Sequence, residues 1–216
     1  MKRIERGEQP AVLIQNGRTW TEAYVSAEAG KPRRSAERWR DDNIRNRLTE
    51  DALGLCMYCE SRVEDVGDLN VEHIKPKSEF PELAHVWGNL GYSCLKCNRN
   101  KSDYYDATLP VIDPYVEDPD NFLDVLGDLI VAKPNNERGR VSVWKLDLQR
   151  IALRNSRAER VEKVLLAVAE YERANGVFRD LLREAILKDA RRGEYSASVF
   201  SYLQIVGFLA REDLVA

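Results

Sequence analysis

The chain has 216 residues, of which 33 are basic and 36 are acidic, so its formal net charge is −3. This balance excludes a protein that binds polyanions over its whole surface, and 44% hydrophobic with 32% charged residues is typical of a soluble globular protein. The longest apolar run, residues 164–169, is far shorter than the ~20 residues of a membrane-spanning helix. No apolar stretch follows the basic residues at the start, so we expect no secretory signal, no membrane partner and a cytoplasmic protein.

The N-terminal part predicts one helix. Residues 1–35 show no long hydrophobic period and are expected to form an irregular lead-in. Ser35 is a candidate N-cap, and the apolar residues after it have roughly helical spacing up to Gly54.

The densest basic stretch of the chain is residues 31–40, which include Arg33 and Arg34. One interpretation is a nucleic-acid-binding arm that follows backbone phosphates. The other is a solvated loop or helix start. The sequence leaves both open.

The middle of the chain changes from strands to loops. Residues 69–74 and 90–93 predict hairpin strands, and a helix is expected from about Asn98. Residues 107–147 contain four prolines and are expected to be mostly loop. Within them we expect a short helix near residues 120–126 and a strand at 141–144.

The last third is predicted to be helical. Apolar residues recur on one helical face from residue 151 until Asn175-Gly176. A second such segment ends by Gly193, and a third runs from about 198 to 206. The sequence therefore predicts three helices that pack on each other or on the rest of the chain.

The four cysteines form two identical Cys-x-x-Cys pairs, and none is left over. The pairs are Cys56 with Cys59 and Cys94 with Cys97. Because disulfides are disfavoured in the cytoplasm, the spacing indicates a structural Zn²⁺ site with four thiolate ligands. The alternative is two redox-active or merely buried cysteine pairs.

Residues between and just after these pairs have the chemistry of phosphodiester hydrolysis. His73 is suited to act as a general base, and Glu72 and Asn98 offer the hard oxygen ligands that Mg²⁺ or Mn²⁺ prefers. Lys101 lies one helical turn beyond Asn98 and is a candidate phosphate contact. Each also has a structural interpretation: a core histidine, surface charges, and for Asn98 a helix N-cap.

The order Cys-x-x-Cys, Glu-His, Asn-Leu, Cys-x-x-Cys-Asn-x-x-Lys resembles the zinc-stapled HNH (ββα-metal) endonucleases. The resemblance implies that His73 is the general base, that Glu72 and Asn98 bind the catalytic metal, and that Asn89 positions His73. Members of the family often have Asp where this chain has Glu72. Neighbouring strand residues point to opposite faces, so Glu72 and His73 share a site only if the backbone bends there.

Most of residues 1–150 also resemble the PtuB family, the HNH nuclease components of Septu anti-phage systems, some of them associated with retrons. The resemblance implies an ATPase partner of the PtuA type. The stretches that carry it are Cys56-Met57-Tyr58-Cys59-Glu60, Glu72-His73-Ile74-Lys75-Pro76-Lys77-Ser78, Phe80-Pro81, Trp87-Gly88-Asn89-Leu90, Asp113-Pro114 and Asp118-Pro119.

The expected fold is α+β and mainly α, with a zinc-stapled ββα-metal finger embedded in a helical protein. Its expected parts are a lead-in and helix (1–55), the HNH nuclease module (56–106), a loop-rich connector (107–147) and a helical region (148–216). The expected function is metal-dependent cleavage of DNA in an anti-phage complex. An RNA-cleaving nuclease and a non-catalytic zinc-stapled binding module are the alternatives, and His85 is assigned no role.

Overall fold

The computed structural model describes residues 1–27, 36–66 and 69–209, and within them the protein is a mainly helical α+β structure. Arg33, Arg34 and the expected N-cap Ser35 lie outside the described residues. None of the described helices has the length and apolar character needed to span a membrane.

The first helix is α1 (Ala11–Ser26), so the expectation of an irregular lead-in over residues 1–35 is wrong. Leu13, Gly17 and Tyr24 lie on one face of α1 and are buried. Gly17 breaks the apolar period in the sequence, although its backbone lies on the buried face near the carbonyl of His85. One of the buried positions of α1 is therefore a glycine, so the apolar period of the helix is incomplete in the sequence.

The second helix, α2 (Asp42–Asp51), begins later than the sequence predicts. Its N-cap is Asp41, whose carboxylate accepts a hydrogen bond from the backbone N–H of Asn43. Ile44 and Leu48 are four residues apart on one face and are fully buried. The short 3-10 helix η2 (Arg38–Arg40) precedes α2, and α3 (Val63–Val66) follows it.

The two strands predicted between the cysteine pairs are confirmed. They are β1 (Leu69–His73) and β2 (Leu90–Cys94), which pair antiparallel with His73 opposite Leu90. Every residue of β2 is buried, including the polar Ser93. The connection between the strands contains two 3-10 turns, η3 (Pro81–Leu83) and η4 (Trp87–Asn89).

Helix α4 (Leu95–Lys101) follows β2 directly and starts three residues before the expected Asn98. The Sγ atom of Cys94 caps it by accepting a hydrogen bond from the backbone N–H of Cys97 at 3.5 Å. The second cysteine pair is therefore built into the strand-to-helix junction.

A second β-hairpin lies where the sequence predicts a helix near residues 120–126. After the 3-10 turn η5 (Pro119–Asn121), β3 (Leu123–Leu126) pairs antiparallel with β4 (Leu129–Ala132). The two-residue turn between the strands contains Gly127 at φ +63°, a backbone conformation that glycine adopts without a steric penalty.

Residues 141–144, predicted as a strand, lie in helix α5 (Glu137–Lys145). A run of four apolar or small residues fits a strand and a helix equally well, so flanking signals decide. Here Asn136 caps the helix by accepting a hydrogen bond from the N–H of Gly139 at 2.8 Å.

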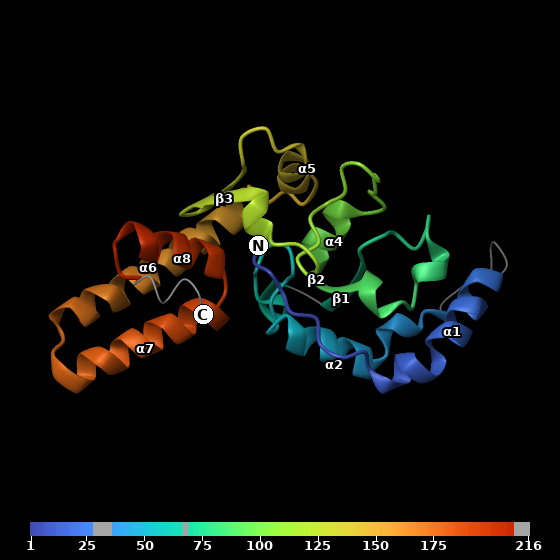
Figure 1. Cartoon of the computed structure of the whole chain (residues 1–216), viewed down its shortest axis with the longest axis horizontal. Coiled ribbons are helices and arrows are strands. Elements are labelled where there is room, and N and C mark those ends of the chain that lie inside the picture. The colour runs from blue at the N-terminus through green and yellow to red at the C-terminus, as the bar shows by residue number, and fades with distance from the viewer. Residues whose placement is uncertain (28–35, 67–68, 210–216) are drawn as a thin grey trace.

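The three C-terminal helices are confirmed as α6 (Ile151–Arg173), α7 (Gly176–Arg192) and α8 (Ser196–Ile205). In Figure 1 they form one end of an elongated molecule, α1 lies at the other end, and α2, β1, β2 and α4 lie between them. These helices enclose a small hydrophobic cluster of their own, made of Val164, Val168, Ile186, Ala190, Val199 and Leu203.

The larger hydrophobic core is shared by segments far apart in the sequence. It includes Trp39 and Ile44 from the N-terminal part, Leu90 from β2, and Leu148 and Leu153 from the start of the C-terminal third. The strand pair and α4 are therefore packed into the body of the protein rather than attached to it.

Candidate active site

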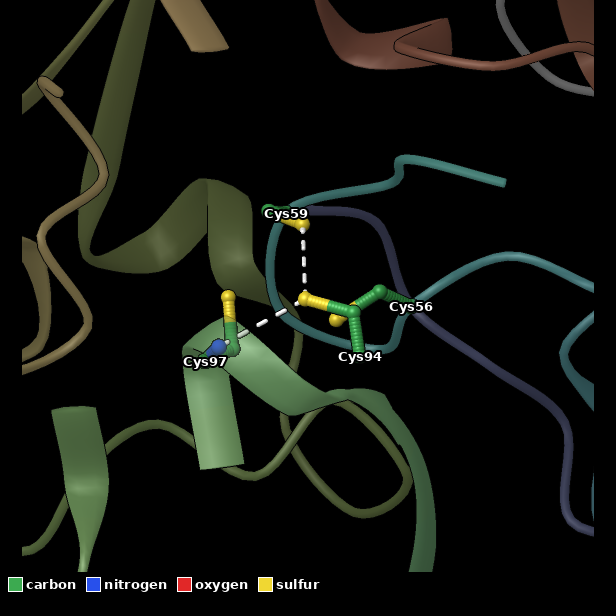
Figure 2. A group of neighbouring side chains, drawn as sticks. All are labelled: Cys56, Cys59, Cys94 and Cys97. Atoms are coloured by element: carbon green, nitrogen blue, oxygen red, sulfur yellow. Dashed lines mark hydrogen bonds between the residues drawn. The ribbon is translucent and has the colours of Figure 1, made fainter. Parts of the chain in front are cut away.

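The four cysteines converge on one buried point. Their Sγ atoms all lie within 4.8 Å of one another, and those of Cys59 and Cys94 are 3.9 Å apart. Four thiolates around a tetrahedral Zn²⁺, each about 2.3 Å from the metal, have sulfurs about 3.8 Å apart. The donor set and its spacing therefore fit a structural zinc ion (Figure 2).

Polar groups, two of them from the C-terminal third, surround this cysteine cluster. Arg150 Nη2 lies 3.8 Å from Cys97 Sγ, within hydrogen-bonding range of a sulfur. Ser61 Oγ is 3.3 Å from Cys59 Sγ and 3.0 Å from the hydroxyl of Tyr195, at the start of α8. The helical end of the molecule is thus joined to the cysteine cluster by side-chain contacts.

A cleft of about 680 Å³ lies beside β1 and α4. It contains three of the predicted site residues, Glu72, His73 and Asn98. The other residues that line it come from η2, α2, β1, α4 and adjoining loops: Glu37, Trp39, Arg40, Arg45, Asn70, Val71, Pro76, Lys77, Arg99, Ser102 and Asp103.

His73 is the last residue of β1, directly after Glu72, and both residues line the cleft. Its Nε2 lies 3.0 Å from the carbonyl oxygen of Ala84. Because a carbonyl only accepts, Nε2 carries the hydrogen of the neutral ring and Nδ1 keeps a free lone pair. Burial, reinforced by the positive charge of Lys77, lowers the pKa of His73 to about 3. The imidazole is therefore neutral near pH 7, as a proton acceptor must be.

Glu72 is 2% exposed, and both of its carboxylate oxygens are held by α4. Oε1 lies 2.6 Å from Lys101 Nζ, and Oε2 accepts a hydrogen bond from Asn98 Nδ2 at 2.7 Å. Burial raises the pKa of Glu72, while the Lys101 ammonium opposes the shift. A carboxylate oxygen has two lone pairs, so each oxygen can accept one more partner.

Lys101, which the sequence predicts to contact a phosphate, lies inside the protein. Lys101 is 2% exposed, and its ammonium is paired with Glu72 and the carbonyl of His73. Lys101 and Asn98 both contact Glu72 from one side of the helix, where Asn98 lines the cleft and the Lys101 ammonium is buried.

Asn89, at the end of η4, connects the two sides of the loop after β1. Its Oδ1 accepts a hydrogen bond from the N–H of Lys75 at 2.7 Å. Its Nδ2 donates to the carbonyls of Lys75 at 3.0 Å and Leu83 at 3.2 Å. Asn89 therefore fixes the backbone two residues beyond His73.

The sequence does not identify Trp39 and most of the basic residues as part of this cleft. Trp39 packs against the ring of His73 and is 3% exposed. Four basic residues line the cleft, Arg40, Arg45, Lys77 and Arg99, beside three acidic ones, Glu37, Glu72 and Asp103. They come from separate elements, so no local sequence pattern groups them.

Residues 56–104 match the family model described as HNH endonuclease. This range begins at the first Cys-x-x-Cys pair and ends just after α4, so it contains Glu72, His73 and Asn98. The chain therefore contains an HNH endonuclease domain, which supports a nuclease activity.

Over most of its length the chain is similar to two bacterial proteins named Septu protein PtuB. It is 25% identical to that of Bacillus thuringiensis, over 94% of this chain and 82% of that protein. It is 24% identical to that of Bacillus mycoides strain KBAB4, over 80% of this chain and 69% of that protein. The chain is also similar to a retron Vc95 protein of Vibrio cholerae serotype O1 biovar El Tor, which is named as an HNH endonuclease. The two are 27% identical over 65% of this chain and 79% of that protein.

Proposed function

We propose that this protein is a metal-dependent endonuclease that hydrolyses phosphodiester bonds, with DNA as its preferred substrate. The observation that carries the proposal is the meeting of a neutral histidine and a buried carboxylate, His73 and Glu72, in one cleft whose lining includes four basic side chains. His73 can serve as a general base, and the basic side chains can bind phosphate.

The catalytic cation would be Mg²⁺ or Mn²⁺, held by Glu72 and by the side-chain oxygen of Asn98. The donor set fits: both ligands are hard oxygen donors, and Mg²⁺ commonly takes one or two carboxylates with water and phosphate in its other positions. When bound, such a cation supplies charge stabilisation for the pentacoordinate phosphorus and the leaving oxygen.

In this mechanism His73 Nδ1 takes a proton from a water molecule in the cleft. The resulting hydroxide attacks phosphorus in line, and the bond to the 3′-oxygen breaks. The Nε2–H···O=C hydrogen bond to Ala84 fixes the tautomer that makes Nδ1 the acceptor, and Asn89 holds the loop that follows. Asn89 therefore acts as a positioning residue.

We further propose that β1, β2 and α4 form a ββα-metal unit within a nuclease module of residues 56–106. In this unit the two strands bring His73 and Glu72 to the substrate, and α4 brings Asn98. Structural Zn²⁺ on the four cysteines ties the start of the module to α4. Since the helix N-cap is itself the ligand Cys94, loss of zinc would disorder the helix that carries Asn98.

Nucleic acid would bind mainly through backbone phosphates. Arg45, Lys77 and Arg99 line the cleft, and the proposed arm with Arg33 and Arg34 belongs to the segment that leads to η2. Such contacts carry affinity without reading a base sequence.

The protein is further proposed to be the effector of an anti-phage defence complex with an ATPase partner of the PtuA type. Similarity to Septu protein PtuB over 94% of the chain supports this.

The test is cleavage of matched DNA and RNA by the zinc-loaded protein, with Mg²⁺ or Mn²⁺ and with the partner ATPase added in a parallel reaction. We expect cation-dependent cutting of DNA. Faster cutting of RNA would change the substrate assignment. If the protein binds nucleic acid but cuts it under none of these conditions, the proposal is contradicted and a zinc-stapled binding module is favoured.

A further inference from the structure

Lys101 lies at the end of α4 with its side chain inside the protein. It is 2% exposed, whereas Lys96 on the same helix is exposed. Burying an ammonium group costs free energy unless the charge is paired and hydrogen-bonded. A buried Lys101 therefore requires partners that pair with its charge.

The two partners of Lys101 belong to neighbouring residues of β1. Its Nζ is 2.6 Å from Glu72 Oε1 and donates a hydrogen bond to the carbonyl oxygen of His73 at 2.9 Å. One ammonium group thus joins the side chain of Glu72 to the backbone of His73. Since Asn98 holds the other carboxylate oxygen, Glu72 is fixed at both oxygens from α4.

The chemistry of lysine suits this position. Its ammonium is a compact charge with three donors, so it can serve a carboxylate and a carbonyl that lie in different directions. The planar guanidinium of arginine is larger and presents its donors in one plane. Methionine has a similar length and no charge, so it removes the two contacts while filling most of the same space.

We propose that Lys101 is a positioning residue, whose ammonium group fixes the Glu72 carboxylate relative to His73 so that the cation ligand and the general base face the same phosphate. This inference rests on the proposed function. It assigns Lys101 a role through Glu72 and excludes direct contact with the nucleic acid.

The experiment compares Lys101→Met with Lys96→Met, a control on the exposed side of the same helix, in the full-length, zinc-loaded protein. Calorimetric titration without nucleic acid gives the Mn²⁺ affinity, and a nicking assay gives kcat and KM. For Lys101→Met we expect Mn²⁺ affinity and kcat to fall about 10- to 100-fold, as for other residues that orient a metal ligand, with KM unchanged. Lys96→Met is expected to match the wild type.

A double-mutant cycle with Glu72→Gln tests whether Lys101 acts through Glu72. We expect Lys101→Met to cause no further loss of kcat once Glu72 is replaced, because both changes remove the same function. Fully additive losses would overturn the proposal. A raised KM with unchanged Mn²⁺ affinity and kcat would also overturn it, because that result is expected of a phosphate contact.

Lysine acetylation of the wild-type protein, read by mass spectrometry, decides the point even if Lys101→Met does not fold. We expect Lys101 to react much more slowly than Lys96, with or without DNA. Fast labelling of Lys101 that DNA suppresses would overturn the proposal. A protein that binds Mn²⁺ through Glu72 and protects Lys101 yet cuts no nucleic acid supports the positioning role and contradicts the proposed function.

Discussion

The indole ring of Trp39 lies edge-on against the imidazole of His73, with ring centroids 4.8 Å apart and an angle of 89° between the planes. Trp39 belongs to η2, outside the matched residues 56–104. Lys77 Nζ lies 5.6 Å from the centroid of the same indole. The N-terminal part of the chain therefore supplies a wall of the candidate active site, and the proposed general base His73 packs against it.

Replacing Trp39 tests this dependence. Trp39→Ala removes a buried aromatic side chain and is expected to lower the free energy of unfolding by about 3–5 kcal/mol. Trp39→Phe keeps an aromatic ring, and we expect a loss of about 1–2 kcal/mol with a roughly tenfold lower kcat, because His73 is held less firmly. Urea unfolding and a nicking assay measure the two effects. Wild-type kcat in Trp39→Phe with lowered stability would show that the indole has a packing role alone.

Removing the zinc is expected to unfold the site rather than slow the chemistry. Cys94 is both a proposed zinc ligand and the N-cap of α4, so Cys94→Ser should lose zinc and tertiary structure together. Metal analysis and circular dichroism of the variant, beside wild type treated with a strong chelator, make the comparison. A folded, zinc-free and active Cys94→Ser protein would refute the structural role.

The two histidines of the chain allow a direct test of their buried environment. Burial lowers the pKa of His85 to about 4 and that of His73 to about 3, against about 6.5 in an unfolded chain. Between pH 6.5 and the folded pKa, the unfolded state binds more protons than the folded state. The free energy of unfolding therefore falls as pH falls, by up to about 1.4 kcal/mol per pH unit for each histidine.

The measurement is an NMR titration of the two imidazole rings without added divalent cation, together with urea unfolding from pH 7 to 5. We expect neither ring to titrate above pH 5, and His85→Gln to reduce the slope of stability against pH. A midpoint near 6.5 for His73 would contradict its burial against Trp39 and the carbonyl of Ala84.

The sequence predicts the cysteine cluster and the first strand pair better than helices α1 and α5. The cysteine pairs and both strands of the hairpin are found where local spacing predicts them, since each depends on a few adjacent residues. Helix α1 could not be recognised, because Gly17 occupies its buried face. Helix α5 was mistaken for a strand, because an apolar run of four residues has no period of its own.

The candidate site divides in the same way. Glu72, His73 and Asn98 belong to the motif quoted from the sequence, and the structure brings them to one cleft. The contribution of Trp39 depends on a tertiary contact between η2 and β1, which no spacing records. The burial of Lys101 likewise depends on how α4 packs against β1.

Basic residues of the cleft are expected to set how strongly binding depends on salt. For duplex DNA, each lost phosphate contact reduces the slope of log affinity against log salt by about 0.9. We therefore expect Arg99→Gln and Arg45→Gln each to weaken binding and flatten the slope, measured by fluorescence anisotropy without divalent cation. Arg173→Gln, at the exposed end of α6, is the matched control and should bind like wild type. Equal slopes in all three variants would show that DNA does not enter this cleft.

In the proposed mechanism His73 is the general base of a phosphodiester hydrolase. The most direct measurement is nicking of supercoiled plasmid with Mg²⁺ or Mn²⁺ by wild type and His73→Ala, after metal analysis shows that both hold zinc. We expect cation-dependent nicking by the wild type and at least a roughly 100-fold loss in the variant, of the order that removal of a general base causes. Equal nicking by the two proteins would contradict it.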